Sequence, residues 1–498
     1  MLRKIRVTLA ALCFTLITLL LLDFTGTLQH WLGWLAKIQF LPALLALNAV
    51  VVIALVVLTL LFGRIYCSVI CPLGVMQDVI SWAHGRRKKN RFTYSPAKTI
   101  LRLVMLAIMV VAIVAGLGSL MALLAPYSSY GRIVNNLLQP LYIWCNNGLA
   151  AIAAHYESYA FYGRDVWLKS LPTFGIAVAT FVIIAVLAWR HGRTYCNTIC
   201  PVGTVLGYLA KFSWFKVRFD ADKCKACGLC TRNCKASCID YKTHTVDYTR
   251  CVACGNCLDK CKFDSLHYGP ARKAKTAAPA DEPSPEPRAD SARRAVMVGG
   301  AIVAAEAALA QAGKKVDGGL AVIEDKAVVK RATPITPPGS LSARNMARHC
   351  TACQLCVAQC PNDVLRPSGN LLTLMQPTMS YERGYCRPEC HRCSEVCPTG
   401  AITPITLDEK VSTQIGHAVW VKENCVVLTD GVSCGNCARH CPSGAIMMVP
   451  SDPNDDLSPM VPAVDRARCI GCGACENLCP ARPFTAIYVE GHEVHKTI

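Results

Sequence analysis

The sequence predicts an α-helical membrane domain with four transmembrane helices, joined to α+β modules that have only a small apolar core. Two observations carry this prediction. Hydrophobic residues make up 53% of the 498 residues and the mean hydropathy is +0.32, so part of the chain suits lipid better than water. The chain also has 31 cysteines. Most of them stand in closely spaced groups, which a disulfide framework does not require.

Four apolar segments account for the predicted helices. They are residues 7–22, 41–62, 101–125 and 171–189. Each approaches or reaches the ~20 residues that cross the hydrocarbon core of a bilayer. Lysines and arginines precede the first segment, lie between the second and third, and follow the fourth. If every segment crosses, these basic residues share one side of the membrane, which the positive-inside rule makes cytoplasmic.

An internal repeat completes this membrane domain, residues 1–215. The pattern Gly-Arg-x-Tyr-Cys-x-x-x-Cys-Pro-x-Gly occurs at 63–74 and again at 192–203, after the second and fourth apolar segments. A pseudo-two-fold arrangement would bring both motifs together at the cytoplasmic face. Four thiolates could then hold a metal or a cluster, namely those of Cys67, Cys71, Cys196 and Cys200. Two alternatives stay open, a thiol pair within each motif and a purely structural repeat.

Residues 216–269 contain two copies of the spacing C-x-x-C-x-x-C-x-x-x-C, which is specific for a bacterial-type ferredoxin with two 4Fe–4S clusters. The eight cysteines are Cys224, Cys227, Cys230, Cys234, Cys251, Cys254, Cys257 and Cys261. The fourth cysteine of each motif ligates the other cluster in such modules, so Cys261 is expected to complete the first cluster and Cys234 the second. Lys235 and Lys262 stand where a proline usually follows. The alternative is that these cysteines bind zinc. The extra cysteine, Cys238, is expected to be a free thiol.

Residues 341–498 contain four more cysteine groups, so the sequence predicts six 4Fe–4S clusters in all. The sixteen cysteines are Cys350, Cys353, Cys356, Cys360, Cys386, Cys390, Cys393, Cys397, Cys425, Cys434, Cys437, Cys441, Cys469, Cys472, Cys475 and Cys479. By analogy with four-cluster electron-transfer subunits, the first motif is expected to share ligands with the fourth, and the second with the third. Cys479 and Cys360 would complete the first and fourth clusters, and Cys441 and Cys397 the second and third.

The linker, residues 270–340, carries a candidate export signal. Residues 270–290 are rich in proline, alanine and charge, as in a flexible spacer. Arg293 and Arg294 then precede the weakly apolar residues 295–312. A paired arginine before such a segment resembles a twin-arginine signal, a pathway that carries folded, cofactor-loaded domains. Export would place the four-cluster domain in the periplasm and leave the two-cluster domain in the cytoplasm. The alternative is a short surface helix with two chance arginines.

Taken together, these motifs resemble a known pair of proteins. The first ~270 residues resemble the NapH-type membrane ferredoxins of periplasmic nitrate reductase systems, with four helices, two CxxxCP motifs and a double cluster motif. Residues 291–498 resemble the NapG-type partner, with its twin-arginine leader and four cluster motifs. The chain therefore looks like a fusion of the two. The resemblance implies a quinol dehydrogenase component in the bacterial inner (cytoplasmic) membrane, which passes electrons to a periplasmic cytochrome or reductase.

Quinol oxidation needs a proton acceptor, because quinol gives up two protons as well as two electrons. The candidates on the predicted periplasmic side are His30, His155, Glu157 and Tyr130. Two other classes of function stay open. One is a cytoplasmic-side electron conduit or metal-centre assembly reductase without quinol oxidation, and the other is a metal-storage or redox-sensing protein. The net charge of +19 does not indicate nucleic-acid binding, because no motif for it is present.

Overall fold

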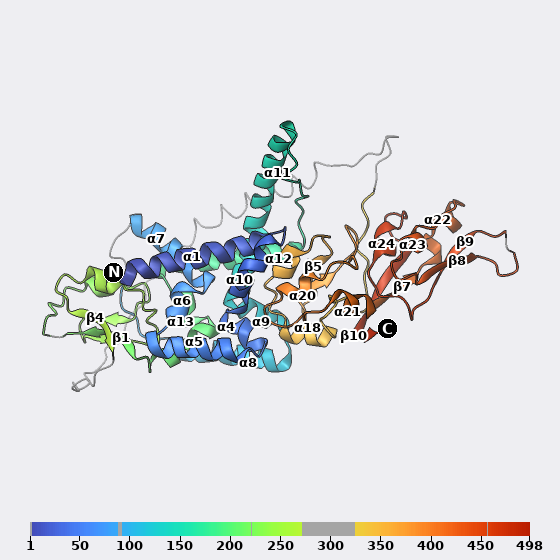
Figure 1. The fold of residues 1–498 in the computed structure, drawn as a ribbon. Coiled ribbons are helices and arrows are strands. Elements are labelled where there is room, and N and C mark those ends of the chain that lie inside the picture. Colours follow the sequence, from blue (N-terminus) through green and yellow to red (C-terminus); the bar gives the residue numbers. More distant parts are fainter. Residues whose placement is uncertain (1, 88–91, 221, 271–323, 456) are drawn as a thin grey trace.

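Three parts follow one another along an elongated molecule in the computed structural model (Figure 1). The structure describes all residues except 1, 88–91, 221, 271–323 and 456. The two-cluster module lies at one end, the helical domain in the middle, and the four-cluster module at the other end. The twin-arginine segment and residues 295–312 lie outside the described residues.

Two long apolar helices, α1 (Leu2–Leu22) and α12 (Leu171–His191), belong to the helical domain. Among the described residues, these two helices are long and apolar enough to cross a membrane, judged by length and composition. Their most apolar windows have mean hydropathies of 2.3 and 2.4, and only 28% of each window is buried. The first and fourth predicted segments are therefore continuous helices.

The second and third predicted segments are interrupted. They form α4 (Phe40–Leu45) with α5 (Ala49–Phe62), and α8 (Thr99–Ala115) with α9 (Gly118–Leu124). The Asn48 side chain caps α5 by accepting a hydrogen bond from the Val51 amide, and Gly116 ends α8 in the left-handed conformation. At 1.5 Å per residue, α5 and α8 are about 21 and 26 Å long, short of the ~30 Å hydrocarbon core. Four continuous transmembrane helices thus stay a prediction.

Further helices connect these elements. They are α2 (Thr27–Leu32), α3 (Trp34–Lys37), α6 (Ile65–Val69), α7 (Pro72–Arg87), α10 (Pro126–Ile133), the π-helical η1 (Val134–Leu138), α11 (Gln139–His155), α13 (Thr194–Thr198) and α14 (Pro201–Ala210). The helices α1, α5 and α8 run along the length of the molecule, whereas α11 projects away from it (Figure 1). The α6 and α13 helices carry the first cysteines of the two CxxxCP motifs.

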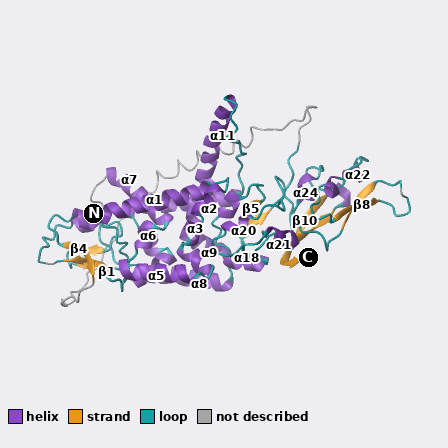
Figure 2. Cartoon of the chain, in the orientation of Figure 1, coloured by secondary structure: helices purple, strands orange, loops and turns teal. Residues whose placement is uncertain are grey.

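Short helices and two-stranded antiparallel sheets build the cysteine-rich modules (Figure 2). The two-cluster module has β1 (Phe215–Phe219) paired with β4 (Leu266–Pro270), β2 (Ile239–Asp240) paired with β3 (Thr245–Val246), α15 (Leu229–Arg232) and α16 (Asn256–Lys260). The expected α+β character is confirmed. Each sheet holds two strands, so the cysteines themselves fill much of the interior.

The four-cluster module follows the same plan. Its strand pairs are β5 (Leu365–Pro367) with β6 (Pro377–Met379), β7 (Thr413–Trp420) with β10 (Ile487–Thr497), and β8 (Ile446–Pro450) with β9 (Met460–Val464). Its helices are α18 (Ala343–His349), α19 (Leu355–Gln359), α20 (Arg392–Val396), α21 (Leu407–Ser412), η2 (Lys422–Asn424), α22 (Val426–Thr429), α23 (Asn436–Arg439) and α24 (Ala474–Leu478). The helix α19 packs against α20, and α23 packs against α24.

Candidate metal centres

The two CxxxCP motifs meet inside the helical domain. Cys67, Cys71, Cys196 and Cys200 are each only 4% exposed. Burial raises the pKa of Cys71 and of Cys200, and in both cases the charges of the other cysteines add to this effect. The four thiols therefore share one buried space, although the motifs are more than a hundred residues apart in the chain.

Each motif holds the other through its arginine. The Arg64 guanidinium of the first motif donates to the Cys196 carbonyl at 3.1 Å, and Arg193 of the second donates to the Cys67 carbonyl at 2.5 Å. Both arginine side chains are fully buried. This exchange has the pseudo-two-fold symmetry that the sequence repeat predicts.

The glycine that ends each motif makes this exchange possible. A Cβ atom on Gly74 would lie 2.3 Å from the Cys67 carbonyl oxygen, and one on Gly203 would lie 2.2 Å from that of Cys196. Real Cβ atoms do not approach so closely, so the helix following each motif can pack here only without a side chain. The repeated glycines thus have a packing role at the four-cysteine centre.

The surroundings of the four-cysteine centre suit a negatively charged group. Nε of Arg64 and Nη2 of Arg193 are buried without a hydrogen-bond partner within the protein, and buried polar groups are costly to leave unpaired. Four thiolates around a 4Fe–4S cluster would supply that negative charge. Among the described residues, no three His, Cys, Asp or Glu side chains are placed to hold a single metal ion. A 4Fe–4S cluster holds its four thiolates farther apart than a single metal ion does, so a site for a cluster need not be a site for a single ion.

In the two-cluster module, Cys234 lies with the second motif. Burial raises the pKa of Cys254 and of Cys257, and the charge of Cys234 adds to both shifts. This placement agrees with the expected exchange of Cys234 into the second cluster. The expected role of Cys261 in the first cluster stays a prediction. Cys238 is less isolated than expected, because its sulfur lies 3.5 Å from that of Cys234.

In the four-cluster module, the first two motifs exchange their fourth cysteines. Burial raises the pKa of Cys356, and Cys397 of the second motif is among the thiols that add to this shift. Burial likewise raises the pKa of Cys393, and Cys360 of the first motif contributes. Cys397 therefore lies with the first three cysteines of the first motif, and Cys360 with those of the second.

The third and fourth motifs form a second such pair. Burial raises the pKa of Cys437 to about 11, and the charge of Cys479 from the fourth motif adds to the shift. Burial also raises the pKa of Cys475, with a contribution from Cys441 of the third motif. The expected pairing of the first motif with the fourth, and of the second with the third, is therefore wrong. The physical reason is that α19 packs against α20 and α23 against α24.

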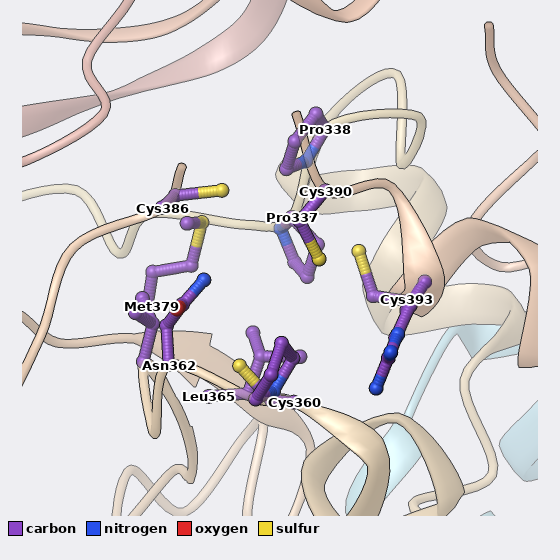
Figure 3. Close-up of a pocket in the computed structure, with 12 residues that line it drawn as sticks. Pro337, Pro338, Cys360, Asn362, Leu365, Met379, Cys386, Cys390 and Cys393 are labelled. Atoms are coloured by element: carbon purple, nitrogen blue, oxygen red, sulfur yellow. The ribbon is translucent and has the colours of Figure 1, made fainter. Parts of the chain in front are cut away.

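Figure 3 shows the second-motif site directly. The sulfur atoms of Cys360, Cys386, Cys390 and Cys393 point toward a common space. Together with Pro337 and Pro338, they line a small, partly open cavity. The extra residue between Cys386 and Cys390 therefore does not prevent these thiols from surrounding one space. A cluster with cysteine ligands fits the donor set of this cavity.

This pairing makes a direct prediction. Replacing Cys397 with alanine is expected to remove one cluster and to free the thiols of Cys350, Cys353 and Cys356, because Cys397 lies with them. Alkylation under anaerobic conditions, followed by peptide mass spectrometry, identifies the freed thiols. The matched variant Cys479→Ala should instead free Cys425, Cys434 and Cys437. Labelling of these third-motif thiols in the Cys397 variant would overturn the pairing.

The proposed proton acceptors do not form one site. Tyr130 is buried beside α1, where its hydroxyl lies 2.6 Å from that of Thr18. His30 is exposed on α2, and His155 and Glu157 are exposed where α11 ends. The structure thus keeps Tyr130 apart from the three exposed residues.

Sequence reasoning missed Asp78, the acidic residue that pairs with Arg193 of the second CxxxCP motif. It lies on α7, is 9% exposed, and forms ion pairs with Arg6, Arg193 and Lys235. A signal for it exists in the sequence. Asp78 is the one Asp or Glu between Asp23 and Glu157, and a single acid in a long apolar and basic region usually has a specific partner.

Comparisons with known proteins agree with the cysteine chemistry. A 4Fe–4S binding domain family matches residues 44–91 and 173–220, which contain the two CxxxCP motifs, and a 4Fe–4S dicluster domain family matches residues 432–482. The methylamine utilization ferredoxin-type protein MauM of Methylophilus methylotrophus is 30% identical over 170 residues, which cover 32% of this chain and 72% of the relative. The chain belongs to the ferredoxin-type 4Fe–4S proteins.

Other relatives match over shorter shares of their length. MauM of Methylobacillus flagellatus is 33% identical over 157 residues, 30% of this chain and 64% of the relative. The putative electron transport protein YccM of Escherichia coli is 27% identical over 200 residues, 39% of this chain and 47% of the relative. The chain thus spans less than two thirds of these two proteins. No solved structure matches the chain.

Proposed function

We propose that this chain is a membrane-bound electron-transfer protein that takes electrons from quinol and delivers them to a periplasmic reductase or cytochrome. It is the NapH–NapG-type fusion that its motifs suggest. The observation that carries this proposal is the position of the two cluster modules at opposite ends of a helical domain whose helices run between them (Figure 1). A bilayer around that domain would separate the two modules.

The outward-facing character of the long helices supports a lipid environment. Only 28% of the apolar window is buried in both α1 and α12, whereas the core helix of a soluble protein is mostly buried. The basic N-terminus of α1 lies at the two-cluster end, where Arg3 forms an ion pair of 2.9 Å with Asp259. By the positive-inside rule, that end would face the cytoplasm, and the four-cluster end would face the periplasm.

Contacts at the far end of the helical domain support a continuous electron route. Gly131 on α10 packs so tightly against the Cys353 carbonyl that an added Cβ would lie 2.3 Å away. Burial lowers the pKa of Arg132 to about 10, and the charges of Tyr195 and Cys353 oppose this shift. Arg132 therefore lies near both Tyr195, beside the four-cysteine centre, and the first-motif cluster. An additional cluster at the four-cysteine centre would complete the route.

The order of clusters beyond that contact follows from the ligand pairing. The first- and second-motif clusters exchange ligands, as do the third and fourth. The Cys386 amide donates to the Cys472 carbonyl at 2.9 Å, so the second-motif cluster adjoins the fourth-motif cluster. Electrons arriving from the helical domain would thus leave through the third-motif cluster, at the end of the molecule that carries β8 and β9 (Figure 1).

The test uses anaerobically purified full-length protein. Reduced menaquinol analogue is added, and cluster reduction is followed by EPR and by bleaching of the visible absorbance. We expect quinol to reduce clusters and a quinone-site inhibitor to block the reaction. Clusters that are reduced by dithionite but stay oxidised with quinol would contradict the quinol dehydrogenase proposal. That result would favour a cytoplasmic-side electron conduit or a metal-centre assembly reductase.

The location of the four-cluster module needs a separate measurement. Protease added to intact spheroplasts is expected to digest residues 341–498 and to spare the two-cluster module. Protection of both modules would place all clusters in the cytoplasm. That result would support an electron conduit on the cytoplasmic side and leave no direct route to a periplasmic acceptor.

A further inference from the structure

A lysine in the two-cluster module occupies a position where proline follows the fourth cysteine in all four motifs of the four-cluster module. This is Lys235, which is only 7% exposed. Lys262, at the same position of the other motif in the two-cluster module, is exposed. Two lysines at equivalent positions thus have different surroundings, and the difference points to a role for Lys235 outside its own motif.

The Lys235 side chain enters the helical domain. Its Nζ lies 2.5 Å from Oδ2 of Asp78 on α7. Arg6 from α1 approaches the same oxygen at 3.0 Å, and Nε of Arg193 lies 2.7 Å from Oδ1. All four side chains are at most 9% exposed. These four residues, which we call the Asp78 latch, combine three cations with one carboxylate.

The Asp78 latch therefore carries surplus positive charge in a buried place. Nε and Nη1 of Arg6 and Nη2 of Arg193 are buried without a hydrogen-bond partner. Such groups are costly to bury unless an anion lies nearby. Beside Lys235 the candidate anion is the cluster of Cys234, Cys251, Cys254 and Cys257, here called the inner cluster. Burial raises the pKa of Cys254, and Lys235 is the group that most opposes this shift.

The Asp78 latch also joins the inner cluster to the four-cysteine centre. The Arg193 amide donates to the Lys235 carbonyl at 2.8 Å, while the Arg193 side chain donates to the Cys67 carbonyl. On the other side, Arg64 donates both to the Thr249 carbonyl at 3.2 Å and to the Cys196 carbonyl. One arginine from each CxxxCP motif thus connects the four-cysteine centre with a loop of the inner cluster.

The first motif of the two-cluster module forms the other cluster, here called the outer cluster. We propose that the Asp78 latch gives the inner cluster a higher reduction potential than the outer cluster. The electron is then held on the inner cluster, next to the four-cysteine centre. Buried positive charge stabilises the more negative, reduced form of a cluster. In the transfer itself, the outer cluster loses one electron and the inner cluster gains it, and no proton moves. The proposal deepens the proposed function by naming this junction, and it rests on the cluster assignment but not on quinol as donor.

The test compares Lys235→Met with Lys262→Met in the full-length protein. Clusters are titrated anaerobically with dithionite and redox mediators, and their reduction is followed by EPR. In Lys235→Met we expect reduction of one cluster to become about tenfold less favourable, a shift of about 59 mV for a one-electron couple. The iron and sulfide contents should not change. Lys262→Met should leave all potentials unchanged, and Lys235→Arg, which keeps the charge, should retain the original potential.

Three outcomes would overturn the proposal. They are unchanged potentials in Lys235→Met, an equal shift in Lys262→Met, and a shift in Lys235→Arg as large as that in Lys235→Met. The last result would assign Lys235 a structural role alone. If Lys235→Met loses iron, Lys235→Gln takes its place under the same criteria. Because dithionite replaces quinol here, a failure of quinol to reduce the protein would not imitate any of these outcomes.

Discussion

Replacing Asp78 with leucine is expected to lower the stability of the cluster-loaded protein by about 3–5 kcal/mol, the usual cost of breaking a buried ion pair by removing one partner. Asp78 is the carboxylate that Arg6, Arg193 and Lys235 share. Burial opposes its ionisation, but the attraction of Arg193 and Lys235 outweighs this effect and lowers its pKa. The carboxylate is therefore charged at neutral pH, and its loss leaves three buried cations without it.

A matched control comes from the same pair of domains. Asp259 on α16 pairs with Arg3 at 2.9 Å, but both side chains are more than a third exposed. Exposed ion pairs contribute about 0–1 kcal/mol, so Asp259→Leu should have little effect. Thermal loss of the cluster absorbance measures both variants, and limited proteolysis shows whether the two-cluster module separates from the helical domain. Equal stability of the two variants would contradict the role given to Asp78.

The double variant Asp78→Leu, Lys235→Leu separates the pair from general damage. Replacing both members of a buried ion pair with apolar residues is often close to neutral. Here Arg6 and Arg193 still need a partner, so we expect partial rather than full recovery relative to Asp78→Leu. If the double variant loses more stability than the two single variants lose together, Asp78 and Lys235 do not stabilise each other.

The cysteine chemistry could be predicted because cluster ligation has strict local spacing. The spacing predicted that Cys234 lies with the second motif of its module, and the position of its thiol agrees with this prediction. The repeat of Gly-Arg-x-Tyr-Cys likewise predicted that Cys67 and Cys196 would meet, because two copies of one unit usually pack with pseudo-symmetry. Which motifs of the four-cluster module exchange their fourth cysteines was not predictable in this way. That choice depends on the packing of α19 on α20 and of α23 on α24, which sequence spacing does not encode.

The interruptions within the second and third predicted transmembrane segments were not predicted, for a different reason. Residues 41–62 and 101–125 are each almost continuously apolar, so hydropathy alone merged α4 with α5 and α8 with α9. The local signals were present in the sequence. Asn48 is a favourable helix-capping residue and Gly116 a favourable helix terminator. The Asp78 latch was out of reach for another reason, since its members Arg6, Asp78, Arg193 and Lys235 come from four separate parts of the chain.

Removal of iron is expected to have the largest effect on the fold. The helices α19 and α20 have five residues each, and the strands β5 and β6 have three residues each. Isolated helices shorter than about 12 residues and single two-stranded hairpins are marginal in water. We therefore expect metal binding to provide folding energy for these modules, on the scale of the roughly 10–16 kcal/mol known for structural zinc in small domains.

Chelation of iron under oxidising conditions, followed by reduction of the freed thiols, tests this dependence. We expect the four-cluster module to become sensitive to protease and to lose its β signal in circular dichroism, while α1 and α12 stay helical in detergent. These helices are the internal control, because their 21 residues each contain one cysteine at most and need no ligand to form. An iron-free module that resists protease as well as the loaded one would mean that its small apolar core is sufficient, and the cysteines would then be carriers of clusters without being the basis of the fold.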